Sequence, residues 1–432
     1  MKKVLSIALA LLLVLGLTAI AKPASADAEE ITLWTYPIGE WGKEETVKAL
    51  TDAFTAETGI KVKVEYLTYT DGDDKMNTAL TAKQGPDLVM EGPERLVANW
   101  GAKGYMVNIA DLFDDQDKAE INPAALAACF ADEATAYEYP LCMTAHCMAI
   151  NLNALKEAGA DQYVNAETHT WTTEQFFNTV NALAAKYGLV GGIYCSGQGG
   201  DQGTRALVNN LYGGTFTNAE HTAYTWDDAK NIQALKALYD LEGIDYDPSI
   251  NGGEEIANFY NGIFKMAFCW NIQQQKNPNS AGTGAGKTAN GDDILFMAFP
   301  SEDGNAVLQG GIWGFGIVNN GDDAKIEAAK KFIQFMADSE HTADAVKASS
   351  FFAARTAIAG NELDVWSDDE LMAEYNKLMP YLGDYYQVTK GWASARTAWW
   401  NMLQQVGASD GSEAAIAAAV ATDCAQANEG AK

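Results

Sequence analysis

"GPDLVMEGPERL", residues 85–96, is the stretch on which the fold prediction depends. Its apolar run ends abruptly at Glu91, and a Gly-Pro pair interrupts the pattern before Glu94 and Arg95 place a carboxylate beside a guanidinium. A short apolar run bounded by Gly and Pro is typical of a buried strand. The charged pair after it has two interpretations: a solvated loop that leads into a surface helix, or the rim of a binding cleft.

The residues before this stretch alternate between two periodicities. Residues 31–36 and 60–67 have the apolar pattern of strands, whereas 43–59 and 73–85 carry apolar residues at helical spacing. Strands that alternate with helices indicate a parallel sheet in an α/β domain. In such sheets, ligands bind beyond the carboxyl ends of the strands. The candidate residues at these ends are Trp34, Tyr36, Glu91, Glu94 and Arg95.

The first 26 residues have the layout of a secretory signal peptide. Two lysines precede an apolar stretch, residues 4–20, and the small residues 24–26 form an A-x-A cleavage site. A permanent membrane anchor is the alternative, but the stretch is shorter than the roughly 20 residues that span a bilayer. The first cysteine is Cys129, which argues against an N-terminal lipid anchor. We therefore expect a soluble mature chain that begins at Asp27 and resides in a periplasm or elsewhere outside the cytoplasm.

Composition limits the possible partners. The 432 residues include 58 acidic and 29 basic side chains, which gives a net charge of −29. Such a surface repels phosphate backbones, so nucleic acid is excluded as a partner. The length suggests two domains or more, and six cysteines are too few for a disulfide scaffold. We expect the protein to act as a monomer.

Motifs for catalysis or metal binding are weak. The four histidines are scattered. Cys142, His146 and Cys147 are close in sequence, but a strand would direct their side chains to opposite faces. We therefore predict no metal and no cofactor. The abundant carboxylates leave a glycosidase pair open, although the sequence cannot place two of them across a cleft.

Taken together, the ordered motifs resemble the sugar-binding family of extracellular solute-binding proteins that serve ABC importers. The resembling stretches include "ITLWTYP", "GPDLVMEGPERLVANWGAKGY", "YEYPLCMTAHCMAINLNALKEAG", "GIFKMAFCW", "GGIWGFGIV" and "WASARTAWW". The resemblance implies a two-lobe periplasmic-binding-protein fold of type II, in which hinge strands join discontinuous α/β lobes. By this analogy the first lobe comprises 27–139 plus 294–342, and the second comprises 140–293 plus 343–432.

The resemblance also implies the positions that bind ligand. Glu94 and Arg95 stand where the family has an Asp-Arg pair that hydrogen-bonds sugar hydroxyls, and Trp392 and Arg396 lie one helical turn apart. Thr144 replaces an expected cleft Glu, and Tyr194 lies in a segment that departs from the family pattern, so maltose itself is in doubt. The expected ligand-binding set is Trp34, Tyr36, Glu40, Trp41, Glu91, Glu94, Arg95, Thr144, Tyr194, Trp270, Gly311, Trp313, Tyr385, Trp392 and Arg396.

The predicted function is the capture of an oligosaccharide in a cleft between the lobes and its delivery to an ABC transporter permease. Tryptophan faces cover the apolar faces of pyranose rings, which favours a sugar. One alternative is another polyol-bearing ligand such as a glycerol phosphodiester. The other is a secreted carbohydrate-active enzyme.

Overall fold

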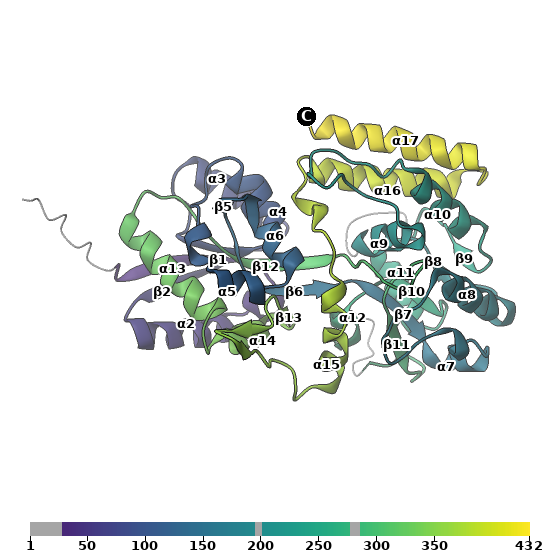
Figure 1. Cartoon of the computed structure of the whole chain (residues 1–432), viewed down its shortest axis with the longest axis horizontal. Helices are drawn as coiled ribbons and strands as arrows, with labels where there is room; N and C mark the ends of the chain where they lie inside the picture. The colour runs from purple at the N-terminus through teal and green to yellow at the C-terminus, as the bar shows by residue number, and fades with distance from the viewer. Residues whose placement is uncertain (1–27, 195–200, 277–285) are drawn as a thin grey trace, which may run out of the picture.

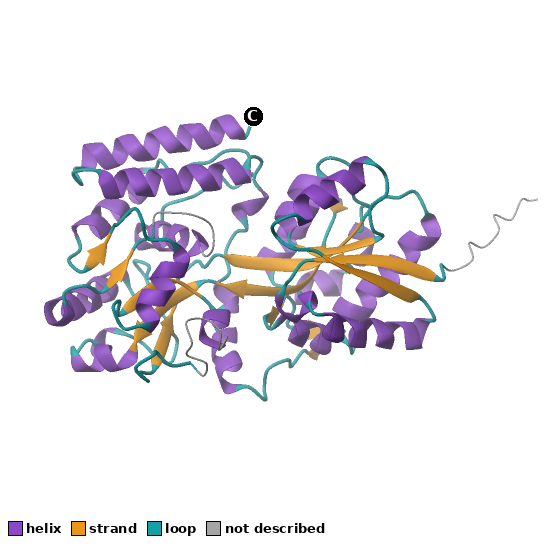
Figure 2. Cartoon of the chain, turned by 180° about the vertical axis from the view of Figure 1, so that it is seen from behind, coloured by secondary structure: helices purple, strands orange, loops and turns teal. Residues whose placement is uncertain are grey.

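The computed structural model describes residues 28–194, 201–276 and 286–432, and these form two lobes side by side (Figure 1). The predicted signal peptide lies outside the described residues. Two long strands, β6 (Tyr139–Ala145) and β12 (Gly310–Ile317), run through the waist between the lobes (Figure 2). The two-lobe α/β fold predicted from the sequence is therefore confirmed.

The first lobe is built on a six-stranded sheet in the order β13-β6-β12-β3-β1-β2. Its strands β1 (Glu30–Thr35), β2 (Lys61–Tyr66) and β3 (Leu88–Glu91) are parallel, as the alternating pattern predicted, whereas β12 is antiparallel to β3 and β6. Helices α2 and α13 pack together on this sheet, with Phe54 edge-on against Phe332 at 5.1 Å. The helices of this lobe are α2 (Glu44–Thr58), α3 (Gly72–Thr81), α4 (Pro93–Arg95), α5 (Asp115–Glu120), α6 (Pro123–Cys129), α13 (Asp323–Ala337) and α14 (Thr342–Ser349).

The second lobe surrounds a three-stranded sheet in the order β10-β7-β11. Its strands are β7 (Cys147–Asn151), β10 (Met266–Trp270) and β11 (Ile294–Met297). The C-terminal helices lie side by side along its outer edge (Figure 1). The helices of this lobe are α7 (Leu152–Glu157), α8 (Thr173–Tyr187), α9 (Asp201–Tyr212), α10 (Ala229–Asp240), α11 (Gly252–Tyr260), α12 (Ile272–Lys276), α15 (Glu370–Asn376), α16 (Trp392–Ala408) and α17 (Glu413–Gly430).

Three short strand pairs complete the fold. They are β4 (Phe130–Asp132) with β5 (Thr135–Ala136), β8 (Gly191–Gly192) with β9 (Ile244–Asp245), and β14 (Ala357–Ile358) with β15 (Asn361–Glu362). The five cysteines among the described residues are buried and free of disulfides.

Strand pairing corrects the lobe boundaries expected from the sequence. The strand β6 pairs with β12 in the first lobe and β7 pairs with β11 in the second, so the first crossing lies at His146 rather than near residue 140. Because β11 belongs to the second lobe, the chain returns to the first lobe at β12 and not at residue 294. The strand β13 (Phe352–Ala353) pairs with β6, so the chain is still in the first lobe after residue 343.

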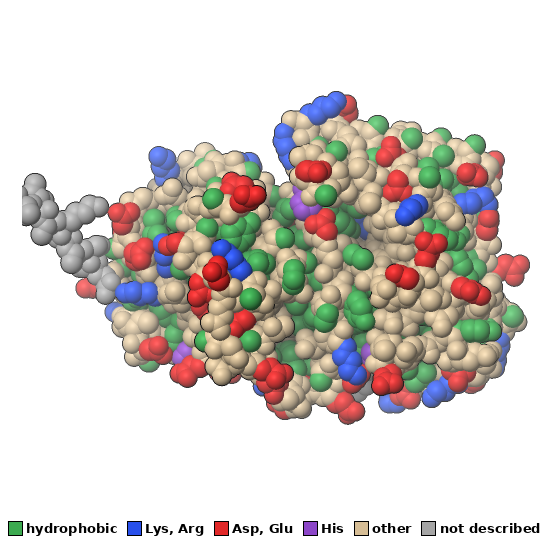
Figure 3. Space-filling view, in the orientation of Figure 1, with side chains coloured by type: hydrophobic (Ala, Val, Ile, Leu, Met, Phe, Trp, Pro, Cys, Tyr) green, Lys and Arg blue, Asp and Glu red, His purple; other side chains and the backbone are tan. Residues whose placement is uncertain are grey.

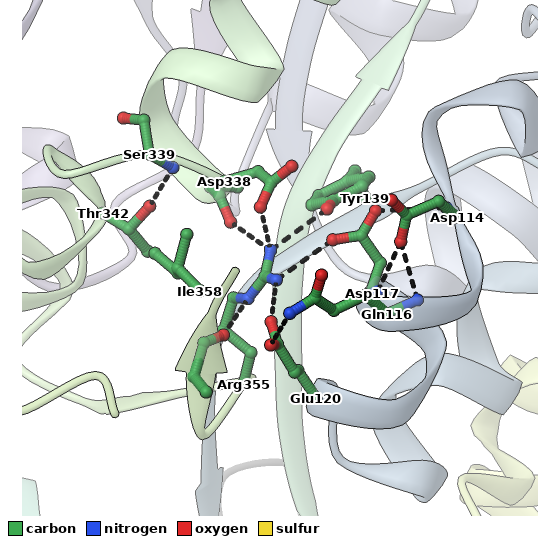
Figure 4. Close-up of polar contacts among 12 residues, drawn as sticks. Asp114, Gln116, Asp117, Glu120, Tyr139, Asp338, Ser339, Thr342, Arg355 and Ile358 are labelled. Atoms are coloured by element: carbon green, nitrogen blue, oxygen red, sulfur yellow. Dashed lines mark hydrogen bonds and ion pairs between the residues drawn. The ribbon is translucent and has the colours of Figure 1, made fainter. Parts of the chain in front are cut away.

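Arg355 fixes the chain to the first lobe just before the last crossing (Figure 4). Its buried guanidinium binds Glu120 at 2.7 Å, Asp117 at 3.0 Å and Asp338 at 2.6 Å, all in the first lobe. The helix α15 lies in the second lobe, where Tyr375 stacks on Phe296 with ring centroids 3.7 Å apart. The last crossing therefore lies between β15 and α15, about 20 residues later than expected.

Candidate functional site

A cavity of about 400 Å³ lies between the lobes, where the hinge strands pass. The first lobe contributes the turn after β1, the loop before α3, the end of β6 and the start of β12. It also contributes Phe351, which lies just after the end of α14. The second lobe contributes the start of α9 and the segment after β10. The lining residues are Pro37, Ile38, Gly39, Tyr69, Thr144, His146, Gln202, Asn271, Gln273, Gly311, Trp313 and Phe351.

An aromatic pair forms one wall of this cavity. Trp313, on β12, stacks on Phe351 with ring centroids 4.8 Å apart and planes within 13° of parallel. The indole lies flat against its own strand because residue 311 is glycine: a Cβ there would lie 2.1 Å from the indole ring. Gly311 therefore has a structural reason to be in the site, since any side chain would displace the aromatic wall.

Neutral polar groups supply the rest of the lining. Thr144 Oγ1 and Gln202 Oε1 are buried and have no hydrogen-bond partner among the described residues. Gln273 donates to the Ser350 carbonyl at 2.9 Å, and its backbone N–H donates to Asn271 Oδ1 at 2.8 Å, which orients both amides. Of the described lining residues, none is Lys, Arg, Asp or Glu. The cavity can therefore form hydrogen bonds with a ligand, but its walls carry no fixed charge beyond what His146 can acquire.

Glu94 and Arg95 belong to a network of charged side chains inside the first lobe. Arg95 makes two hydrogen bonds to Asp73, at 2.7 and 3.1 Å, and one to Glu91 at 2.8 Å. Tyr36 donates to Asp73 at 2.8 Å, and its ring faces the guanidinium at 5.4 Å. These contacts engage Arg95 with carboxylates of its own lobe, so it organises the end of the sheet rather than lining the cavity.

Two buried carboxyl groups beside this network have raised pKa values. Burial raises the pKa of Glu91 to about 8, although attraction to Arg95 opposes the shift. Burial also raises the pKa of Glu138 well above its usual value, and the neighbouring Glu94 and Glu91 carboxyls raise it further. Neither oxygen of Glu138 has a hydrogen-bond partner among the described residues. The raised pKa of Glu138 favours its protonated form, whereas Glu91 lies within hydrogen-bond distance of the Arg95 guanidinium.

One hydrogen bond joins this network to the second lobe. The hydroxyl of Tyr385 donates to Glu94 Oε2 at 2.9 Å, and Tyr385 itself is only 3% exposed. The bond links α4 of the first lobe to the segment that precedes α16. Glu94 and Tyr385 therefore contact each other, whereas the sequence predicted that each would contact ligand.

The predicted site residues fall into three groups. The cavity brings together Thr144, Gly311 and Trp313. The charged network contains Tyr36, Glu91, Glu94, Arg95 and Tyr385. The remaining seven lie elsewhere in this conformation: Trp34, Glu40, Trp41, Tyr194, Trp270, Trp392 and Arg396.

Two of those seven residues are tryptophans that belong to the hydrophobic core. Trp41 is fully buried, donates to the Ala345 carbonyl at 3.0 Å and packs edge-on against Phe315. Trp270 is fully buried and donates to the Tyr375 hydroxyl at 2.7 Å. The expectation that these rings line a cleft is not met in this conformation, because each face packs against protein.

The other five of those residues have partners or surroundings outside the cavity. Lys75 lies over the Trp34 ring at 5.0 Å, and Glu40 pairs with Lys43. Arg205 covers the Trp392 ring at 4.8 Å, while Arg396 lies over Trp400 at 5.8 Å. Tyr194 is fully buried, and its hydroxyl has no partner among the described residues.

Most of the cavity lining was not predicted from the sequence. The residues outside the expected set are Pro37, Ile38, Gly39, Tyr69, His146, Gln202, Asn271, Gln273 and Phe351. Asn271 had a usable signal, since it directly follows a predicted strand and so lies at a strand end. Tyr69 also follows a predicted strand, but it stands in a polar loop with no periodic pattern. In the described part of the chain, no cluster of metal-ligating side chains occurs, and no helix is long and apolar enough to cross a membrane.

Two α/β lobes with hinge strands and a cavity between them define a solute-binding protein. Residues 49–374 match the family model described as "Bacterial extracellular solute-binding protein", and the chain belongs to this family. The match covers most of the chain, as the resemblance seen in the sequence predicted. No curated protein matches the chain at a significant level.

Solved structures share the fold at low sequence identity. The sugar-binding protein MalE from Xanthomonas citri is 16% identical, with a TM-score of 0.72 over 93% of this chain and 96% of that chain. The cyclic alpha-maltosyl-1,6-maltose binding protein from Arthrobacter globiformis is 15% identical, with a TM-score of 0.73 over 93% and 100%. A probable secreted solute-binding lipoprotein from Streptomyces coelicolor is 20% identical, with a TM-score of 0.69 over 92% and 99%. These similarities establish the fold.

Proposed function

We propose that this protein captures a neutral oligosaccharide between its lobes and delivers it to the membrane subunits of an ABC importer. The observation that carries the proposal is a cavity lining that combines an aromatic wall with neutral hydrogen-bonding groups. The part of the Trp313–Phe351 pair that lines the cavity offers an aromatic surface for the apolar side of a sugar ring. Asn271 and Gln273 offer amide donors and acceptors for hydroxyls. The volume of about 400 Å³ lies within the range of roughly 300–1,000 Å³ typical of ligand sites.

The same lining favours a sugar over a glycerol phosphodiester. A buried phosphate needs a cationic partner, which Arg or Lys normally provides, and the described lining contains neither. The net charge of −29 adds long-range repulsion of anions, and acidic side chains are spread over both lobes (Figure 3). The sugar-binding descriptions of the Xanthomonas and Arthrobacter proteins support the same choice.

We also propose binding without turnover. The carboxyl groups that a glycosidase would need are Glu91, Glu94 and Glu138, and none of them lines the cavity. Incubation of pure protein with oligosaccharides should release no reducing ends. Release that disappears in a Glu94→Gln variant would instead support the secreted-enzyme alternative.

The proposal includes location and oligomeric state. Export through the predicted signal peptide would leave a monomeric receptor that begins at Asp27, without a lipid anchor, and whose closed form the permease recognises. N-terminal sequencing of exported protein checks this, and a fatty-acylated or uncleaved terminus would contradict it.

Trp313→Ala is expected to weaken binding of the preferred oligosaccharide by about tenfold to a hundredfold, because it removes the stacking face. The preferred sugar is first found in a thermal-shift screen of starch and plant-wall oligosaccharides, with a glycerol phosphodiester included. Titration calorimetry then compares the variant with the wild type.

Trp34→Ala is the matched control, since it removes the same side chain from a first-lobe position outside the cavity lining. Its affinity should equal that of the wild type. The opposite pattern, in which Trp34→Ala loses affinity and Trp313→Ala does not, would show that the cleft has been placed on the wrong residues.

A further inference from the structure

We infer that Tyr385 and Glu94 set the ligand affinity of this protein without touching ligand, because their hydrogen bond fastens the two lobes together beside the binding cavity. The expected effect on ligand affinity rests on the proposed function, whereas the contact between the two lobes does not. The bond is 2.9 Å long, and it joins the buried Tyr385 to the partly exposed Glu94. Neither residue lines the cavity.

Glu94 is held rigidly on the first lobe. It lies on α4 directly after β3, and its carboxylate also approaches Arg95 at 3.6 Å. The carboxylate folds back over Gly92, where a Cβ would lie 2.7 Å from Glu94 Oε2 and 2.8 Å from the Ile312 carbonyl. Residue 92 must therefore be glycine for the acceptor to occupy this position.

Tyr385 is held equally firmly on the second lobe and its hinge. The next residue, Tyr386, stacks on Phe216 at 4.6 Å and accepts a hydrogen bond from Arg205 at 3.0 Å. The preceding residue, Asp384, pairs with His221 at 2.8 Å. The same segment also binds the start of the hinge strand β12, because Gln309 donates to the Asp384 carbonyl and Gln387 donates to the Gly310 carbonyl, each at 2.9 Å.

Because the bond joins α4 to a segment of the other lobe beside this hinge, we expect opening of the lobes to break it. Loss of the Tyr385 hydroxyl leaves the Glu94 carboxylate without its second-lobe donor, next to the Glu91 and Glu138 carboxyls. A hydrogen bond of this kind favours the form in which it is made, and in that form both lobes line the cavity. Because ligand binds only when both lobes contact it, the fraction of closed protein scales the apparent affinity.

Tyr385→Phe tests the inference, since it removes the hydroxyl and keeps the ring. We expect affinity for the preferred oligosaccharide to fall about tenfold, mainly through faster dissociation. We also expect a larger radius of gyration for the ligand-free protein in small-angle scattering. In a Glu94→Ala background, the same substitution should have no further effect on either quantity.

Tyr386→Phe is the matched control, because its hydroxyl accepts a hydrogen bond from Arg205 of the second lobe. It should leave both the radius and the affinity unchanged. The small-angle scattering measurement uses ligand-free protein. It therefore tests the contact between the lobes even if the proposed ligand class is wrong. An unchanged radius in Tyr385→Phe, or an equal loss of affinity with and without Glu94, would overturn the inference.

Discussion

Arg355→Met is expected to lower the free energy of unfolding by about 3 to 5 kcal/mol, because removing one partner of a buried ion cluster leaves the others uncompensated. Arg355 is 3% exposed and binds Asp117, Glu120 and Asp338. Its Nε–H also donates to the Ala357 carbonyl at 2.7 Å (Figure 4). Urea unfolding of the variant and the wild type at neutral pH measures the difference.

Two further variants separate the buried cluster from a general effect of losing an arginine. Arg396→Met makes the same change at a half-buried position of α16. It should lower the free energy of unfolding by less than about 1 kcal/mol. Adding Glu120→Gln to Arg355→Met should restore part of the loss, since it removes one of the stranded charges. If Arg355→Met costs no more than Arg396→Met, the cluster does not anchor the last crossing as described.

Glu138→Gln is expected to stabilise the protein, and the gain should grow with pH. Burial holds the pKa of Glu138 well above its usual value, so the folded protein keeps a proton that the unfolded chain releases above about pH 4.5. Stability that depends on this proton is present at low pH and is lost as pH rises toward the folded pKa. A neutral glutamine releases no proton, so the variant avoids this loss.

Unfolding curves at pH 4.5 and pH 7 test this expectation. The stabilisation by Glu138→Gln should be larger at pH 7 than at pH 4.5. Glu133 lies in the exposed turn between β4 and β5. Glu133→Gln should change the free energy of unfolding by the same small amount at both pH values. A gain from Glu138→Gln that is equal at the two pH values would show that Glu138 does not titrate as its burial implies.

The parts of the fold that the sequence predicted are those with a local cause. The alternation of strands and helices from residue 30 to 91 follows from apolar periodicity, which each segment carries within itself. Lobe membership has no such local signal. Both "ILFMAFPS" and "GIWGFGIV" are short apolar runs, yet β11 pairs with β7 and β12 pairs with β6. Only the pairing of residues distant in sequence decides which lobe each strand joins.

The site was harder to predict for a related reason. Trp270 and Trp313 both follow or occupy apolar strands, but one is fully buried beside Tyr375 and the other forms the cavity wall. The difference depends on what packs on each ring, which the sequence does not contain. Asn271 and Gln273 lie in a polar stretch without periodicity, so their convergence on the cavity appears only once the two lobes are in place.

The measurement that tests the central claim most directly is a crystal structure of the protein with its preferred oligosaccharide. The account predicts a sugar ring against Trp313, with hydrogen bonds from Asn271 or Gln273, so that both lobes contact the ligand. Two larger hollows offer other places for it: one of about 540 Å³ beside Asn210 and Asp384, and one of about 520 Å³ beside Arg355. A sugar found in either of these, with the interlobe cavity empty, would contradict the account.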